Sequence, residues 1–296
     1  MSAKKRALAV FVAVLAFLMA IFITLYPVIS ARYNEQHHAE VHIQYREEVE
    51  QKDDSEIRKA KALAVAYNEA IVPGALMVES FSQEALLWAS EDYADQLNLT
   101  GNGIMGYVEI PSINVDLPIY HGTSDATLEV GIGHLLGSSL PVGGESTHTV
   151  LTAHSGMASQ KMFSDLPQLE IGDVFYLEVL GEKLAYQVDQ IKTVLPHDTS
   201  YLGITEGEDY CTLVTCTPYG VNTHRLLVRG IRIPYEEAEQ IMEEQGRLDT
   251  SSTVSNWERE YMKGIWIGVG AVGAMGITAS IVLLIRKRRK RSGNMV

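Results

Sequence analysis

Cysteine is almost absent from this 296-residue chain, which contains only Cys211 and Cys216. Both lie in one apolar run, DYCTLVTC, that is typical of a single β-strand. On an extended strand, residues five apart point to opposite faces and are separated by about 16 Å, whereas a disulfide needs Cα atoms within about 7 Å. The two thiols therefore cannot pair with each other in this strand, and two cysteines are too few for a metal cage.

Basic residues are also scarce, with 24 Lys and Arg against 37 Asp and Glu and a formal net charge of −13. Nine of the basic residues lie in the two terminal tails, which leaves 15 basic against 37 acidic residues between them. A surface this acidic is a poor nucleic-acid binder, and we expect no nucleic-acid partner. The sequence shows no dense acidic loop with a calcium-ligand pattern, so we expect no metal and no cofactor.

Charge is missing altogether from two segments, residues 7–31 and 264–285, each long enough to cross a bilayer. Basic residues precede the first segment and follow the second one, at 286–291. By the positive-inside rule both termini are then cytoplasmic and the region between them lies outside the cell membrane. The alternative for the first segment is a cleaved signal peptide, but the apolar run is long and VISA has a bulky Ile where a small residue is expected.

These features divide the chain into a cytoplasmic tail with a transmembrane helix (1–31), a membrane-proximal part, a central domain, a second transmembrane helix (264–285) and a basic tail (286–296). The membrane-proximal part comprises a helical stalk at 32–70, rich in Glu, Lys, Ala and Gln, and a mixed segment at 71–103 with one short helix. We expect the stalk histidines His37, His38 and His42 to be solvated.

The central domain, residues 104–234, is a succession of short β runs separated by turn signals such as LGEK, which predicts a hairpin. No long helical pattern interrupts them, which favours a mostly antiparallel barrel with short helices. An acidic helix and linker follow at 235–263. The seven runs are IMGYVEI, VDLPIY, THTVLTA, DVFYLEVL, KLAYQVDQI, DYCTLVTC and HRLLVRGIRI.

The two cysteines differ in their positions along the strand. Cys211 begins the run, and we interpret it as a small buried hydrophobic residue. Cys216 ends the run directly before Thr217-Pro218, and proline stops a strand because it has no N–H to donate. A thiol at a strand end can reach a substrate, so Cys216 is the candidate nucleophile, although a structural role is equally compatible with its position alone.

A reactive thiolate needs a base or a cation nearby. Arg225 lies nine residues after Cys216, and the intervening TPYGVNT is long enough for the two residues to face each other across antiparallel strands. Its five donors suit a substrate carbonyl or a developing oxyanion, while the alternative is a salt bridge at the domain surface.

The candidate histidine is His154, which ends the apolar strand THTVLTAH before a Ser-Gly turn. His121 and His134 also end apolar runs, so spacing alone does not decide among the three. His224 adjoins Arg225 and points to the opposite face of its strand.

Together these motifs resemble a known family. TLVTC followed by an arginine-bearing strand resembles the cysteine signature of sortases, and LTAHSG resembles their histidine motif. MGYVEIPSINVDLPIYHG is similar to the N-terminal half of the same domain. The resemblance covers residues 104–233, and TPYGVNTHRLLVRG with two membrane spans is most like the class C, pilus-associated branch.

The resemblance implies an eight-stranded sortase-type β-barrel and a cysteine transpeptidase of Gram-positive bacteria. It assigns the nucleophile to Cys216, the acid and base to His154, and substrate or oxyanion positioning to Arg225. The implied reaction cleaves an LPxTG-like sorting signal between Thr and Gly through a thioacyl-enzyme and joins it to a pilin lysine. Thr215, inside the cysteine motif, is a candidate for substrate binding. The implied partners are pilin subunits and the lipid bilayer.

Class C sortases usually carry a lid with an Asp-Pro-aromatic anchor, and no proline of this chain follows an aspartate. Residues 73–98 occupy the lid position, with Trp88 and Phe81 as candidates to cover the cleft. Two alternatives to pilus assembly stay open. One is a sortase that attaches surface proteins to peptidoglycan, and the other is a membrane-tethered scaffold barrel without activity.

Overall fold

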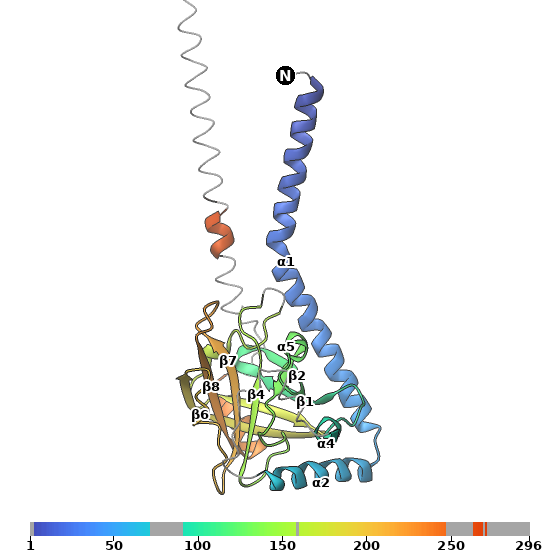
Figure 1. Cartoon of the computed structure of the whole chain (residues 1–296), viewed down its shortest axis with the longest axis vertical. Coiled ribbons are helices and arrows are strands. Elements are labelled where there is room, and N and C mark those ends of the chain that lie inside the picture. The colour runs from blue at the N-terminus through green and yellow to red at the C-terminus, as the bar shows by residue number, and fades with distance from the viewer. Residues whose placement is uncertain (1–2, 72–90, 158–159, 247–262, 269, 271–296) are drawn as a thin grey trace, which may run out of the picture. The chain divides into compact units, whose positions relative to one another are not determined.

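The computed structural model describes residues 3–71, 91–157, 160–246, 263–268 and 270 (Figure 1). Two compact units are distinguished, one of residues 1–25 with 254–296 and the other of residues 26–253. Trp88 and Phe81, the candidate lid residues, lie outside the described residues, as does most of the second predicted span.

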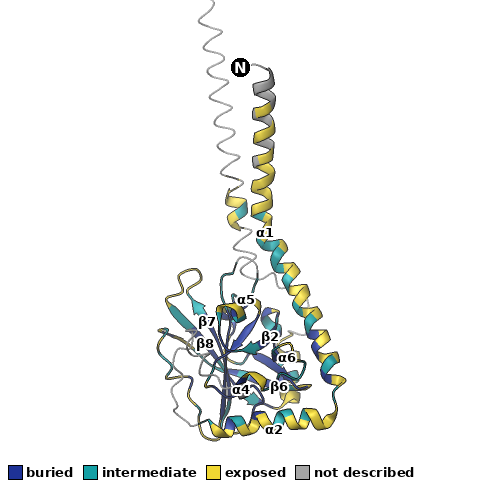
Figure 2. Ribbon diagram, turned by 45° about the vertical axis from the view of Figure 1, so that its right-hand side comes forward, coloured by how far each residue is buried: buried dark blue, intermediate teal, exposed yellow. Residues whose placement is uncertain are grey.

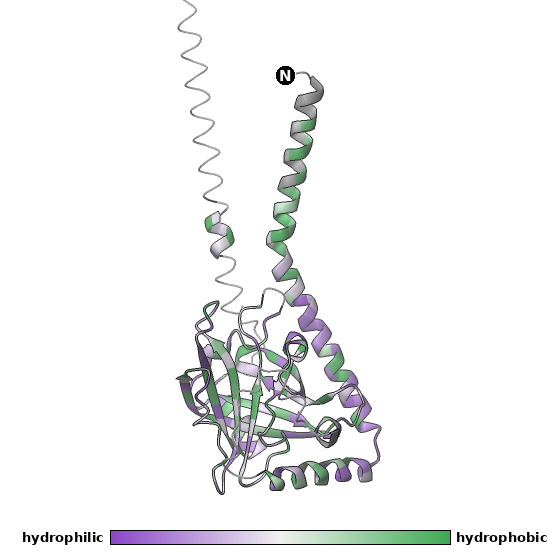
Figure 3. Ribbon diagram, in the orientation of Figure 1, coloured by the Kyte–Doolittle hydropathy of each residue, from purple (hydrophilic) through white to green (hydrophobic). Residues whose placement is uncertain are grey.

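The chain begins with a long helix, α1 (Ala3–Glu50). Among the described residues, α1 alone contains a segment long and apolar enough to cross a membrane, with a mean hydropathy of 1.3. Figure 3 shows that its apolar residues gather toward its N-terminal end and that polar residues dominate toward its C-terminal end. The first charge-free segment is therefore helical and suited to be a membrane anchor.

The second unit is built on eight strands that form a closed barrel in the order β1-β2-β3-β4-β7-β8-β6-β5. The pairs β2–β3 and β4–β7 are parallel, and the other six are antiparallel. The strands are β1 (Ile104–Ile110), β2 (Val115–His121), β3 (Ile132–His134), β4 (Thr147–Thr152), β5 (Val174–Val179), β6 (Glu182–Val194), β7 (Asp209–Thr217) and β8 (His224–Ile233).

This architecture confirms the expected eight-stranded sortase-type barrel, and seven of its strands coincide with the seven β runs in the sequence. The eighth strand, β3, has only three residues and is too short to show an alternating pattern. Short helices connect or flank the strands. They are α2 (Asp54–Ala70), α4 (Glu91–Asp95), η1 (Pro111–Ile113), α5 (Asp125–Val130), η2 (Leu166–Gln168) and α6 (Tyr235–Glu244).

Two local features show how the sequence shapes the strands. LGEK forms the predicted hairpin between β5 and β6, with Leu180 and Gly181 at φ 54° and 78°, as a tight two-residue turn requires. In β1 the alternation is broken by a register shift between Ile104 and Gly106. Strict alternation along IMGYVEI would place Ile104 and Val108 on one face. Because the bulge adds one residue to the strand, Ile104 packs in a different cluster from Val108.

The C-terminal part of α1 and helix α2 pack on the barrel, as the burial pattern in Figure 2 shows. Tyr45 and Val49 of α1 join Ile104 and Tyr107 of β1 in one buried cluster. At the other end of this layer, the Asn68 amide of α2 donates to the Leu140 carbonyl oxygen (3.2 Å) and accepts from its N–H (2.7 Å). Residues 32–50 and 54–70 lie in two helices that are separated by a break at 51–53, and part of their surface is an interface with the barrel.

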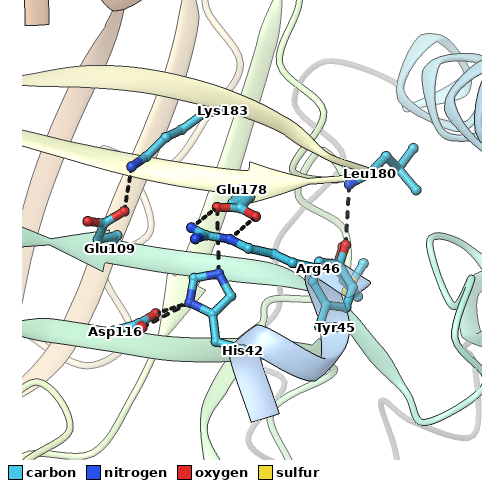
Figure 4. A network of polar contacts seen from close by, with 9 residues as sticks. His42, Tyr45, Arg46, Glu109, Asp116, Glu178, Leu180 and Lys183 are labelled. Carbon is cyan, nitrogen blue, oxygen red and sulfur yellow. Dashed lines mark hydrogen bonds and ion pairs between the residues drawn. The ribbon is translucent and has the colours of Figure 1, made fainter. Parts of the chain in front are cut away.

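A polar network joins α1 to the barrel (Figure 4). The His42 ring stacks on Tyr107 at 3.9 Å between centroids, and its Nδ1 lies 2.9 Å from Asp116 Oδ2. Its Nε2 lies 3.6 Å from Glu178 Oε2, and Arg46 donates both Nε and Nη2 to the same carboxylate. The expectation of a solvated His42 is wrong, because this helix face contacts the barrel through charges and no apolar stripe marks it in the sequence.

Burial acts to lower the pKa of His42, but its hydrogen bonds with Asp116 and Glu178 outweigh burial and the pKa is raised. The same network opposes the effect of burial on Glu178 and lowers the pKa of that carboxyl to about 2. Tyr107 and Arg46 are the other polar groups that face the imidazole. The protonated form of His42 is therefore favoured in the folded protein.

The seam formed by His42, Arg46, Asp116 and Glu178 predicts a pH-dependent stability. Because the folded pKa of His42 exceeds its unfolded value of 6.5, its contribution is fully present below pH 6.5 and is lost as the pH rises through the folded pKa. Each unit by which the folded pKa exceeds the unfolded pKa contributes about 1.4 kcal/mol to the free energy of unfolding. The free energy of unfolding, measured in urea across this window, should fall with rising pH more in the parent than in His42→Gln.

The matched control is His37→Gln, since His37 is an exposed histidine on the same helix. This variant should keep the free energy of unfolding close to that of the parent at each pH. Parallel curves for the parent and His42→Gln would contradict the prediction.

Candidate active site

Strand β7 carries both cysteines, and its ladder decides what each can do. Cys211 is fully buried in the main core cluster with Leu213. Burial raises the pKa of the Cys211 thiol well above its ordinary value, so this thiol stays protonated. The interpretation of Cys211 as a small buried hydrophobic residue is confirmed.

Cys216 lies on the other face of the same strand, as residues five apart must. It is half-buried and reduced, and the ladder of β7 ends one residue later, before Pro218. Val214, two positions before it on the same face, packs in a second cluster with Leu227. The thiol therefore lies where an apolar layer ends and a loop begins.

Arg225 lies directly opposite Cys216. The antiparallel register of β7 and β8 pairs Cys216 with Arg225 and Thr217 with His224. Opposite residues in such a pair have Cβ atoms about 4.5–5.5 Å apart on the same face, so the guanidinium is within reach of a group bound at the thiol. Arg225 Nη1 lies 3.4 Å from the Asn222 carbonyl oxygen and 3.3 Å from that of His224. The cross-strand pairing expected from the loop length is confirmed.

His154 approaches Cys216 from the other side. Strand β4 runs parallel to β7 with Thr152 paired to Val214, and the Ala153 N–H continues the ladder to the Val214 carbonyl oxygen (3.1 Å). Extending this register by two residues along each chain places His154 level with Cys216. One row of candidate residues, named the catalytic row, therefore comprises Cys216 of β7, Arg225 of β8 and His154 in the turn after β4 (β4, β7 and β8 in Figure 1).

The competing histidines have other contacts. His134 is fully buried, with its Nδ1 2.8 Å from the Tyr93 hydroxyl and its Nε2 2.9 Å from the Ser139 carbonyl oxygen, and burial lowers its pKa to about 4. His121 Nε2 lies 2.7 Å from the Gln96 carbonyl oxygen. Both imidazoles are held by structural hydrogen bonds, which leaves His154 as the histidine in the row with Cys216.

Two hydroxyl groups border the catalytic row. Thr215 is 1% exposed, and its hydroxyl donates to the Ala153 carbonyl oxygen at 2.8 Å. Because Thr215 precedes Cys216 on the strand, its side chain points to the opposite face. The Thr215 side chain therefore connects β7 to the segment after β4, and the geometry does not place it for the substrate contact expected from the sequence.

The second hydroxyl belongs to Ser155, which donates to the Cys216 carbonyl oxygen at 2.7 Å. Sequence reasoning missed it, because its acceptor lies 61 residues away and only the β4–β7 register brings the two together. In the sequence, the one feature that points to Ser155 is its position directly after His154. Among the residues that the structure describes, no group of three or more His, Cys, Asp or Glu side chains could hold a metal ion.

A profile of the sortase domain family matches residues 108–233, which include the whole catalytic row. Among curated proteins, sortase D of Bacillus subtilis is 32% identical over 131 residues, which are 43% of this chain and 63% of the relative. Sortase A of Streptococcus agalactiae is 28% identical over 156 residues, 52% of this chain and 60% of the relative. The chain thus spans less than two thirds of the length of these curated relatives.

Solved structures give longer matches. Sortase C of Streptococcus pneumoniae is 49% identical with a TM-score of 0.61, and the match covers 66% of this chain and 97% of that one. Sortase C1 of Streptococcus agalactiae is 46% identical with a TM-score of 0.59, covering 66% of this chain and 98% of that one. With the barrel, the sortase domain match and these near-complete overlaps, the chain belongs to the sortase family, and its structural neighbours are class C sortases.

Proposed function

We propose that this protein is a membrane-anchored cysteine transpeptidase that cleaves an LPxTG-like sorting signal between Thr and Gly and joins it to a pilin lysine. The observation that supports this proposal is the catalytic row, in which Arg225 pairs with Cys216 across β7 and β8 and His154 follows the end of the β4–β7 ladder. The S. pneumoniae sortase C has specificity for pilin substrates, and its 49% identity with this chain supports a pilin as the substrate here.

The proposed reaction begins when the Cys216 thiolate attacks the carbonyl carbon of the signal's threonine. The Arg225 guanidinium donates hydrogen bonds to the oxyanion that develops on the carbonyl oxygen. The bond to the glycine nitrogen then breaks, and protonated His154 supplies the proton that lets this amine leave. The product of this half-reaction is a thioester between Cys216 and threonine.

The second half-reaction transfers the acyl group to an amine. A lysine ε-amine attacks the thioester carbonyl, neutral His154 accepts the proton that the amine loses, and Cys216 leaves as a thiolate. An isopeptide bond forms and the enzyme returns to its starting state. Each amide exchange is thereby divided into two acyl transfers with lower barriers.

The nucleophile assignment predicts opposite results for the two cysteines. Cys216→Ala should abolish cleavage of a fluorogenic LPxTG peptide, because no other described thiol faces the catalytic row. Cys211→Ala should keep most of the turnover, since it removes one buried sulfur atom from the core. Melting temperatures of both variants control for folding. Loss of turnover in folded Cys211→Ala, with Cys216→Ala active, would reverse the assignment. Turnover in both variants would exclude a cysteine nucleophile, and absence of turnover in the parent would leave the scaffold barrel.

The assignment of acid and base to His154 predicts a rate loss of two or more orders of magnitude in His154→Ala, the scale of losing one acid–base group. His121→Ala should cost far less, because its imidazole is bound to the Gln96 carbonyl oxygen. Single-turnover cleavage of the peptide and transfer to a lysine-bearing pilin peptide should both be measured. A near-normal rate in His154→Ala would exclude it as the acid, and preference for a peptidoglycan amine would favour a surface-protein sortase.

We also propose that both termini are cytoplasmic and that the barrel lies outside the cell. The test uses chains without the native cysteines that carry Glu243→Cys, on the exposed side of α6, or Ser292→Cys. An impermeant maleimide on intact cells should label Glu243→Cys, whereas Ser292→Cys should react only after lysis. Labelling of Ser292→Cys in intact cells contradicts the double-span topology.

A further inference from the structure

The turn that carries His154 is tied to the end of β7 by side chains. The backbone ladder between β4 and β7 ends with the bond from the Ala153 N–H to the Val214 carbonyl oxygen. Beyond this bond, two side-chain hydroxyls form hydrogen bonds between the same two segments, one in each direction. Thr215 of β7 donates to the Ala153 carbonyl oxygen (2.8 Å), and Ser155 of the turn donates to the Cys216 carbonyl oxygen (2.7 Å).

These two bonds enclose the nucleophile and its histidine. One joins the residue before Cys216 to the residue before His154, and the other joins the residue after His154 to Cys216 itself. A bond on each side of the pair fixes the separation of the two main chains just where the backbone ladder has ended. Among the described residues, the bond from Ser155 is the last hydrogen bond that connects the histidine turn with Cys216 along these two segments.

The far side of the turn is held independently. The His154 carbonyl oxygen accepts from the Phe163 N–H (3.0 Å), and the Gly156 N–H donates to Ser164 Oγ (2.9 Å). Gly156 has φ +79°, and a Cβ added there would meet the Tyr219 ring at 3.3 Å, so the turn lies against the β7–β8 loop. The turn would therefore keep its shape without the Ser155 hydroxyl and would lose its connection to Cys216.

We propose that Ser155 is a positioning residue, whose hydroxyl holds the His154 turn in register with Cys216 by donating to the carbonyl oxygen of the nucleophile. This inference rests on the proposed function, because it requires His154 and Cys216 to act as a pair. It separates two roles within the histidine motif, proton transfer by His154 and alignment by the residue that follows it. Alignment matters because a displacement of about 1 Å at a reacting centre can cost about 100-fold in rate.

The test compares Ser155→Ala, which deletes the hydroxyl, with Ser155→Thr, which keeps it. In Ser155→Ala we expect kcat for LPxTG peptide cleavage to fall by about 10- to 100-fold, with KM within about twofold of the parent, since the substrate contacts are unchanged. Ser155→Thr should recover most of kcat. A purely structural role would lower the melting temperature without this split between kcat and KM.

The matched control is Ser164→Ala, which removes a hydroxyl from the same turn on the side away from Cys216. It should keep kcat within about twofold of the parent. A loss in Ser164→Ala equal to that in Ser155→Ala would overturn the proposal, because the shape of the turn would then set the rate. An unchanged kcat in folded Ser155→Ala, or equal losses in Ser155→Ala and Ser155→Thr, would overturn it as well.

A second measurement needs no peptide and so separates this inference from the proposed function. The rate of alkylation of Cys216 by iodoacetamide at about pH 7 should fall several-fold in Ser155→Ala, because a displaced imidazole favours the thiolate less. At about pH 10, where a thiol ionises without help, the parent and variant rates should converge. Equal rates at both pH values would overturn the positioning role even if the peptide proves not to be a substrate.

Discussion

The site depends on one constraint, the register of β7 with its two neighbours. The antiparallel ladder to β8 pairs Arg225 with Cys216, and the parallel ladder to β4 ends at Ala153, directly before His154. A slip of one residue in either ladder would move a whole strand's side chains to the other face. The proposed mechanism therefore depends on this register, because Cys216, Arg225 and His154 come from three different segments of the chain.

The apolar layers on both faces of β7 enforce this register. On the inner face, Leu151, Leu213 and Val228 form one row across the same three strands, and all are fully buried. On the outer face, Val214 and Leu227 pair directly beneath Cys216 and Arg225 and are buried in a second cluster. Because both faces of the strand are covered, a slip would bring polar hydroxyls into one layer and expose apolar side chains in the other. Hydrophobic burial on both faces of β7 thus fixes the strand register on which the geometry of the catalytic row depends.

The seam between α1 and the barrel consists of charged side chains, whereas the barrel itself is stabilised by apolar contacts. A buried ion pair gives little net stability, since desolvation offsets the attraction between the charges. It does discriminate between helix positions, because a rotation of α1 would leave Glu178 buried without Arg46 and His42. We interpret the seam as a device that fixes the register of the helix, with Tyr45 and Val49 supplying the apolar contact beside it.

Sequence reasoning predicted what depends on local pattern or on short loops. The β runs show their alternation directly, and the seven residues TPYGVNT after Cys216 were enough to pair Cys216 with Arg225. What depends on distant partners was missed. His42 finds its carboxylates 74 and 136 residues away, and no helical pattern marks that contact. Choosing His154 over His121 and His134 needed the family resemblance, because all three end apolar runs and only the parallel β4–β7 ladder distinguishes them.

The hydroxyl hydrogen bonds of Thr215 and Ser155 lie where the backbone ladder between β4 and β7 ends. The backbone ladder no longer aligns the two segments at this point, yet the proposed mechanism needs His154 and Cys216 to stay aligned. An apolar contact between the two segments would hold them together but would not fix their relative position along the strand direction. A hydroxyl donor on a carbonyl acceptor is short and directional, and Thr215 uses its bond on the face away from Cys216. The two bonds thereby connect the segments beyond the end of the ladder, and neither bond uses the Cys216 side chain.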